Sequence, residues 1–290
     1  MGVKQSRMKG RIRASIFVSL LAFPSLADAI TELDLHDLGP TGIGAAAATT
    51  SIADGSSAFN LNPAGLSRHS ERRFFDVHSK FFQKRPKENW SVGGSVIDGK
   101  TEDPLHWGFR FNSVHTERIK RDTYDLALSF NFKNIVLAGI SNQLSDFDRA
   151  LETPERWTYS MNAGLLLFAT DFLSVGAAMS NLLRSTRAAT IEPVKGRLGL
   201  SFNWIWFRVA ADWERDFSHK TNEGRTSLEL NPIDMMKFRA GYYRNFTTKA
   251  HGLGLCTSVA VFDRLSLDFS LLDAFNSSLR VFTGGLRVEI

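Results

Sequence analysis

The sequence predicts an all-β protein, a transmembrane antiparallel β-barrel of about 14 strands with an N-terminal plug segment in its lumen. Three observations in the 290-residue chain support this fold class. Long stretches alternate between large apolar residues and small or polar ones. The connections between these stretches alternate between short and long. The chain also begins with a segment that has the form of a secretory signal.

The first residues have the composition of a signal peptide. Basic residues from Lys4 to Arg13 precede an apolar run over 14–23, and small residues end the segment. The run is too short to cross a bilayer as a helix, so we expect cleavage after Ala27, with Ala29 as the alternative site. The predicted division of the chain is a signal peptide over 1–27, a plug segment over 28–71 and a barrel over 72–290.

Charge, cysteine content and mean hydropathy argue against several classes of protein. The whole chain has a formal charge of +5, but residues 1–27 hold five basic and no acidic side chains, so the remainder is formally neutral. This gives no basis for nucleic-acid binding. The single cysteine, Cys256, excludes an intrachain disulfide. A mean hydropathy of −0.14 argues against a helical membrane protein but is compatible with alternating barrel strands.

From residue 72 onward the sequence has the period-two pattern of strands with two different faces. In residues 124–132, for example, aromatic and leucine side chains alternate with Asp, Ala, Ser and Asn. Such segments are near the length that a tilted strand needs to cross a membrane. The pattern is shared by the segments 72–83, 90–98, 105–114, 122–132, 135–143, 157–168, 171–181, 194–204, 206–216, 225–231, 236–246, 251–262, 264–272 and 279–290.

A soluble β-sandwich or lipocalin-like barrel is the alternative, because its strands also alternate. The apolar face of a soluble sheet must be covered by protein. Here the apolar class is large, no helices remain to cover it, and the other class is mainly Gly, Ser, Ala and Asn with sparse charges. Lipid is therefore the expected cover of the apolar face, and a lumen is the expected place of the small residues.

Connection lengths and aromatic positions agree with a membrane barrel. Short turns on one side and longer loops on the other are typical of outer-membrane barrels, as are aromatic girdles at both interfaces. The tight connections are expected at 133–134, 169–170, 205, 232–235 and 263, and the longer ones at 144–156, 182–193, 217–224, 247–250 and 273–278. The aromatic residues near the long-loop side are Trp90, Tyr124, Trp157, Trp213 and Phe246, and those near the short turns are Phe132, Phe172, Trp204, Trp206 and Phe262.

Residues 28–71 do not alternate. They contain a run of small residues over 42–48, which superficially offers the glycine spacing of a dinucleotide site, but no strand precedes it and no βαβ unit follows. Further on, Pro63 holds Asn62 out of the helical region, and Gly65 permits a left-handed conformation. We expect a compact, self-capped segment that leads into the first strand. On the residues alone, an ordinary turn between leader and barrel fits equally well.

The stretch from Gly42 to Arg68 resembles the N-terminal plug, or hatch, of the outer-membrane long-chain fatty-acid transporter (FadL-type) superfamily and of PorV-like barrels. The residues singled out in the plug motif are Gly42, Gly44, Asp54, Ser57, Asn62, Pro63, Ala64, Gly65 and Leu66. The resemblance implies a barrel of this strand number whose N-terminal segment folds into the lumen and blocks it, and by way of which hydrophobic substrates pass. Similar plug motifs occur in barrels that serve as shuttles for secreted proteins.

The chain departs from that resemblance at its loops and at its end. The predicted outer loops are small, whereas the fatty-acid transporters collect ligand on long outer loops. The last residue is Ile290, where barrel proteins usually present an aromatic residue, although the alternation of Leu286, Val288 and Ile290 is intact.

No hydrolase, zinc-protease or P-loop motif is present, so we expect no enzyme, no metal and no cofactor. Four acidic residues fall in a predicted outer loop over 146–155: Asp146, Asp148, Glu152 and Glu155. They could hold a divalent ion, but a solvated loop is the favoured interpretation.

Inward-facing charges of both signs are predicted to pair across the lumen and to bind the plug, because a selective pore would show a ring of one sign. These lumen charges are Arg110, Asp125, Arg197, Arg208, Asp212, Glu229, Arg239, Asp268, Arg287 and Glu289. Cys256 falls in the inward class of its strand.

Two functions are compatible with these observations. The first is a bacterial outer-membrane barrel that binds or passes hydrophobic molecules, fatty acid or lipid-like, through a plugged lumen; the plug motif favours it. The second is a non-transporting structural or assembly barrel that holds lipid or a partner, including as a homo-oligomeric ring; the short loops and mixed-charge lumen favour it. The expected partners are outer-membrane lipid and a hydrophobic small molecule, with no nucleic acid.

Overall fold

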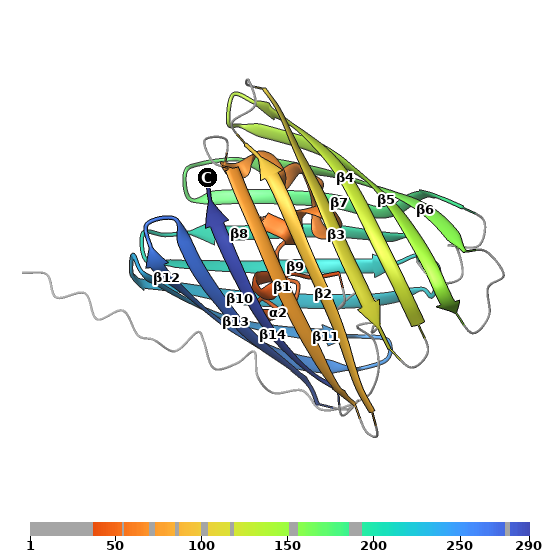
Figure 1. The fold of residues 1–290 in the computed structure, drawn as a ribbon. Helices are drawn as coiled ribbons and strands as arrows, with labels where there is room; N and C mark the ends of the chain where they lie inside the picture. The colour runs from red at the N-terminus through yellow and green to blue at the C-terminus, as the bar shows by residue number, and fades with distance from the viewer. Residues whose placement is uncertain are drawn as a thin grey trace, which may run out of the picture.

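The computed structural model shows a closed antiparallel barrel (Figure 1). Each strand pairs with its neighbours in sequence, and the last strand pairs with the first. The residues that the structure describes are 37–53, 55–69, 73–84, 87–99, 104–116, 119–150, 156–185, 193–275 and 279–290. The predicted signal peptide with both cleavage sites, the start of the predicted plug segment and Asp54 lie outside them.

The strands of the barrel are long and evenly distributed along the chain. They are β1 (Arg73–Lys84), β2 (Lys87–Asp98), β3 (Leu105–His115), β4 (Ile119–Phe132), β5 (Val136–Ala150), β6 (Trp157–Phe168), β7 (Leu173–Arg184), β8 (Lys195–Asn203), β9 (Phe207–Asp216), β10 (Thr221–Ile233), β11 (Met236–Asn245), β12 (His251–Phe262), β13 (Leu265–Ala274) and β14 (Leu279–Glu289). Ahead of them come the short helices α2 (Pro40–Gly44) and α3 (Ala58–Leu61) and the 3-10 helices η1 (Gly55–Ser57) and η2 (Pro63–His69).

The predicted fold class and strand number are confirmed, but four strands extend into predicted loops, namely β5, β7, β10 and β13. β5 continues to Ala150, so Asp146 and Asp148 belong to a strand and not to an outer loop. Asp146 pairs with Arg156 at 2.9 Å and Asp148 with Lys120 at 2.5 Å. The ladder therefore continues where the side chains are no longer apolar. β10 likewise begins at 221, four residues earlier than predicted.

Glu152 and Glu155 of the same acidic stretch lie outside the described residues. Within the described ranges, no group of three or more His, Cys, Asp or Glu side chains is placed to hold a metal ion.

Large apolar side chains cover the outside of the barrel. Along β3, Leu105, Trp107 and Phe109 are exposed, whereas the alternating His106, Gly108 and Arg110 are buried. All the aromatic residues assigned to the two girdles are exposed, by fractions from 37% for Tyr124 to 70% for Phe262. An outer face of this kind suits contact with lipid, as the alternation predicted.

The described N-terminal residues lie inside the barrel (Figure 1). Helix α2 packs mainly against β12 and β13, and η2 packs against β4, β5 and β6. Nearly every described residue over 37–53 and 55–67 is buried. The segment therefore reaches from one part of the lumen wall to another. Of the helices in the described part of the chain, none has the length and apolar character that crossing a membrane requires.

Candidate functional site

The Asn62-Pro63 dipeptide forms hydrogen bonds both within the N-terminal segment and to the barrel wall. Asn62 is extended, with φ −163° and ψ 99°, as a residue before proline prefers. Its Nδ2 donates to the carbonyl oxygen of Thr50 at 2.7 Å and to that of Leu165 in β6 at 3.0 Å. Its Oδ1 accepts from the Ala64 N–H at 3.2 Å. Because Asn62 is fully buried, these bonds satisfy polar groups that water does not reach.

Gly65 is needed for space and not for an unusual conformation. Among the described glycines, only Gly55 has a positive φ, of 53°, so the expectation of a left-handed Gly65 is wrong. A Cβ at Gly65 would instead overlap the carbonyl group of Ala53. Gly44 is constrained in the same way, because a Cβ there would overlap Cys256 of β12. Cys256 is buried and faces inward, as predicted.

The remaining motif residues lie in the interior of the segment. A Cβ at Gly42 would be 3.4 Å from the Cβ of Ser57, which brings the two helical parts into contact. Leu66 packs in a small buried cluster that includes Phe59 and Ile97. These residues therefore form the packed body of the segment.

Glycines of the barrel wall leave room for the backbone of this segment. A Cβ at Gly139 would overlap the backbone of Pro63, and a Cβ at Gly241 would overlap the backbone of Ala45. We use the name glycine belt for the inward-facing wall glycines at which a Cβ would meet the segment: Gly108, Gly139, Gly164, Gly176, Gly199, Gly241, Gly254 and Gly285. The belt draws on strands from β3 to β14, so the wall is fitted to the segment on several sides.

Asp37 joins the segment to β3 and β4 through charge. Its carboxylate accepts a hydrogen bond from Arg121 at 2.6 Å, and its carbonyl oxygen accepts one from Arg110 at 2.7 Å. Arg110 also pairs with Asp125 at 2.6 Å. Burial would raise the pKa of Asp37, but the charges of Arg121, Arg110 and Lys80 hold it below its usual range. The carboxylate is therefore ionised at neutral pH.

Other strands bind the backbone of the segment directly. Asp212 of β9 accepts from the Thr50 N–H at 2.6 Å, and Arg197 of β8 donates to the Asn60 carbonyl oxygen at 2.8 Å. Inward-facing serine hydroxyls donate to further carbonyl groups of the segment; these serines are Ser129, Ser141, Ser174 and Ser227. Polar backbone groups in the lumen thus find partners on the wall.

The other predicted lumen charges gather near the short-turn end. Glu229 accepts from Arg239 and lies 3.6 Å from Arg208. The guanidinium of Arg287 lies over the ring of Phe74, 5.9 Å from its centroid. A polar cavity of about 270 Å³ separates these groups, and its lining includes Arg208, Glu229, Arg239, Asp268, Arg287 and Glu289. They do not lie with Arg110 and Asp125, so the lumen charges form more than one group.

Several buried ionisable side chains were not in the predicted set. They include Asp76, His78, Lys80, Arg121, Lys195, Glu214, Asp216, Glu223 and Arg225. Glu214 is the centre of one group, because it pairs with Arg197 at 2.5 Å, with Arg225 at 3.1 Å and with Lys195 at 3.7 Å. The alternation that identifies Arg110 as inward-facing applies equally to these positions. It could have identified the ones that lie in strands whose bounds were predicted correctly.

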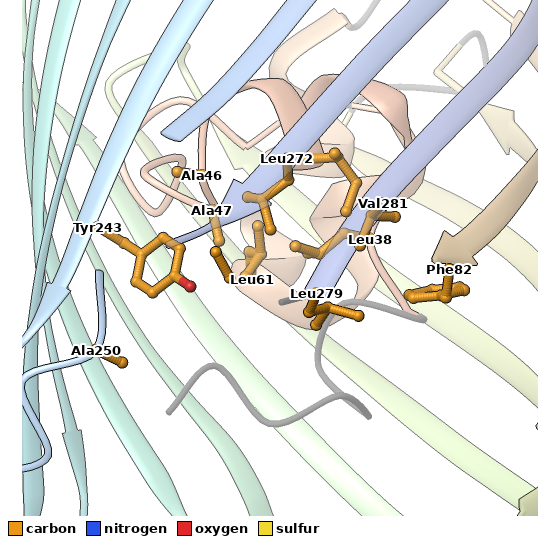
Figure 2. Close-up of a cluster of buried hydrophobic side chains, with 12 residues drawn as sticks. Leu38, Ala46, Ala47, Leu61, Phe82, Tyr243, Ala250, Leu272, Leu279 and Val281 are labelled. Carbon is orange, nitrogen blue, oxygen red and sulfur yellow. The ribbon is translucent and has the colours of Figure 1, made fainter. Parts of the chain in front are cut away.

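Towards the long-loop end, one side of the lumen is apolar. Figure 2 shows Phe82, Leu272 and Val281 of the barrel around Leu38 and Leu61 of the N-terminal segment. We use the name apolar wall for this cluster, which consists of Leu38, Ile43, Ala46, Ala47, Leu61, Phe82, Tyr243, Ala250, Leu272, Ala274, Leu279 and Val281. Inward-facing apolar side chains are not what a water-filled porin presents to its lumen.

Comparison with known proteins identifies the fold. No family model and no curated protein matches the chain. Among solved structures, the CymD monoaromatic hydrocarbon channel aligns with a TM-score of 0.66 at 13% identity, over 88% of this chain and 97% of that one. The chain has the fold of an outer-membrane channel.

Two further structures agree with this assignment. The toluene transporter TbuX of Ralstonia pickettii aligns with a TM-score of 0.63 at 13% identity, over 89% of this chain and 98% of that one. The toluene transporter TodX of P. putida gives 0.63 at 11% identity, over 88% and 98%. At these identities the likeness concerns the arrangement of the barrel.

Proposed function

We propose that this protein passes small hydrophobic molecules through its lumen across a bacterial outer membrane, and that the N-terminal segment is the plug that controls passage. The observation that carries the proposal is the apolar wall. Phe82, Leu272 and Val281 face the lumen at its long-loop end and are covered there by Leu38 and Leu61 of the segment. A hydrophobic molecule that passes between the segment and this side of the barrel would exchange water for apolar contacts.

The class of substrate is supported from two sides. The structures that share the fold are described as a monoaromatic hydrocarbon channel and toluene transporters. The motif around Asn62 and Pro63 resembles the plug of the fatty-acid transporters. Both point to hydrophobic cargo, and small aromatic hydrocarbons are the first candidates to test because outer loops that would collect a long amphiphile are short here.

The glycine belt favours the alternative of a static barrel. A segment fitted to the wall at Gly139, Gly241 and other belt positions is held by many contacts, as a purely structural lumen filling would be. Transport requires that this segment move or that the molecule pass around it, whereas a structural barrel requires neither. A direct uptake measurement therefore separates the two functions.

The proposed experiment measures uptake of radiolabelled toluene by cells with and without the protein in an outer membrane rich in lipopolysaccharide. Leu272→Gln places a polar amide in the apolar wall and should reduce uptake several-fold, because a molecule that passes between the segment and the barrel loses apolar contact there. Ser91→Gln introduces the same side chain at another inward-facing, buried position outside the apolar wall and serves as the matched control. Equal uptake with and without the protein would leave the structural barrel as the better account.

A further inference from the structure

The lipid-facing side of the barrel contains a groove that the transport proposal does not use. It has a volume of about 750 Å³ and an almost entirely apolar lining. Its floor is formed where small outward-facing residues lie between large ones, at Ala138, Ala163, Ala177 and Gly196. Leucine, isoleucine and methionine side chains, such as Leu165 in β6, form its sides. The groove thus has the shape and chemistry of a site for extended hydrocarbon.

The groove runs diagonally across the membrane-facing surface. Leu105, near the short-turn end of β3, pairs with Phe130, and successive cross-strand partners lead from there through Leu165 and Leu198 to Trp213 on β9. Because barrel strands tilt, a row of cross-strand partners climbs from one interface to the other. The β9 end of the groove therefore lies at the long-loop interface.

Two arginines point outward beside that end. Arg215 is the cross-strand partner of Gly196 in the groove floor, and it shares its face of β9 with Trp213. Arg244 pairs with Gly224, which in turn pairs with Trp213, so it lies two strands further along the same row. Arg215 donates to the amide oxygen of Asn222 at 3.0 Å. Both arginines thus lie at the level of the aromatic girdle.

These arginines differ from other basic residues on the same rim. Lys120, Arg156 and Arg280 each pair with an aspartate, at 2.5, 2.9 and 3.2 Å. In the part of the chain that the structure describes, neither Arg215 nor Arg244 has a carboxylate within ion-pair distance. An outward-facing guanidinium at the headgroup level, beside an apolar groove, is complementary to an anionic lipid.

We propose that this face of the barrel binds a phosphorylated, multiply acylated lipid of the outer leaflet, with phosphate at Arg215 and Arg244 and an acyl chain in the groove. Guanidinium groups suit phosphate because they donate two parallel hydrogen bonds. The exposed rings of Trp213 and Phe217 lie where the polar and apolar parts of such a lipid meet. The site is independent of the lumen, so toluene uptake and lipid binding can fail separately.

The test titrates the purified full-length protein in detergent micelles with diphosphoryl lipid A and follows binding by native mass spectrometry. Each arginine at a charged membrane interface contributes enough that its loss should weaken binding about fivefold. The double variant Arg215→Gln/Arg244→Gln should therefore bind about 25-fold more weakly. Arg280→Gln, which removes a rim arginine that already has an aspartate partner, is the matched control and should bind like the wild type.

Two further variants keep the proposal falsifiable. Arg215→Lys/Arg244→Lys retains the charge but not the paired hydrogen bonds, and it should recover part of the affinity, which a merely misfolded double variant would not show. Ala177→Phe fills the groove and should weaken binding without any change of charge. Wild-type affinity in the double glutamine variant, or equal binding of lipid A from which the phosphates have been removed, would overturn the phosphate site. Wild-type affinity in Ala177→Phe would overturn the acyl site.

Discussion

At single positions, the size of a side chain decides whether the N-terminal segment fits in the lumen. Gly139 and Gly241 lie on strands, where glycine is ordinarily unfavourable because it packs nothing and loses more entropy on folding. Here the missing Cβ is what allows Pro63 and Ala45 to approach the wall. An ion pair then fixes the N-terminal segment in the space that the glycines leave, since Asp37 of the segment binds Arg121 of the wall.

Gly139→Val should displace the segment while the barrel still forms. The added side chain would overlap the backbone at Pro63, and overpacking of this kind costs about 1–3 kcal/mol. We expect a lower melting temperature and a higher single-channel conductance in planar bilayers. Gly284→Val is the control, because no atom of the described residues lies within 4 Å of the position of its Cβ. If Gly139→Val conducts no more than Gly284→Val, the glycine belt does not position the segment.

At the scale of strands, the alternation was sufficient to predict the barrel, its strand number and the face of most residues. It failed at strand ends. In β5 the outward residues become acidic beyond the apolar zone, and Asp146 and Asp148 were interpreted as loop although the backbone ladder continues to Ala150. In β10 the first four residues were missed because the outward positions among them, Asn222 and Gly224, carry no apolar side chain. The hydropathy pattern marks only the part of a strand that lies within the apolar membrane layer. The length of the strand is set by its backbone hydrogen bonds to the neighbouring strands.

The two faces of the strands can be distinguished in membranes. Leu128 and Leu200 are exposed on the outer face, whereas the neighbouring Ser129 and Ser201 are buried and face the lumen. Spin labels attached to a cysteine at each position should therefore divide into two classes of accessibility to oxygen, high at the leucine positions and low at the serine positions. The same oxygen accessibility at all four positions would contradict the orientation of the strands.

For the whole molecule, the position of the N-terminal segment in the lumen was the feature that the sequence predicted least well. The motif around Asn62 indicated a compact segment, but its partners Leu165, Arg121 and Asp212 are distant in sequence and are brought near only when the barrel closes. The apolar wall also arises only in the closed barrel, because Phe82 and Leu272 come from strands at opposite ends of the chain.

These features support one account, in which a barrel is closed by a segment that packs on an apolar side of its lumen. The strands after residue 72 supply the hydrogen bonds that a membrane demands, so a barrel without the segment should still insert. What it should lose is the closure of the lumen, since the segment crosses from the β12–β13 wall to the β4–β6 wall.

Single-channel conductance of a variant that lacks residues 37–66 tests this central claim most directly. The account predicts that the wild-type protein is nearly closed in planar bilayers and that the deletion variant, once its insertion has been verified by heat-modifiable migration in gels, conducts clearly. A wild-type protein that already conducts like an open porin would contradict the assignment of the segment as a plug. A deletion variant that inserts but stays closed would show that side chains of the wall alone fill the lumen, and the proposed path for hydrophobic molecules would be lost.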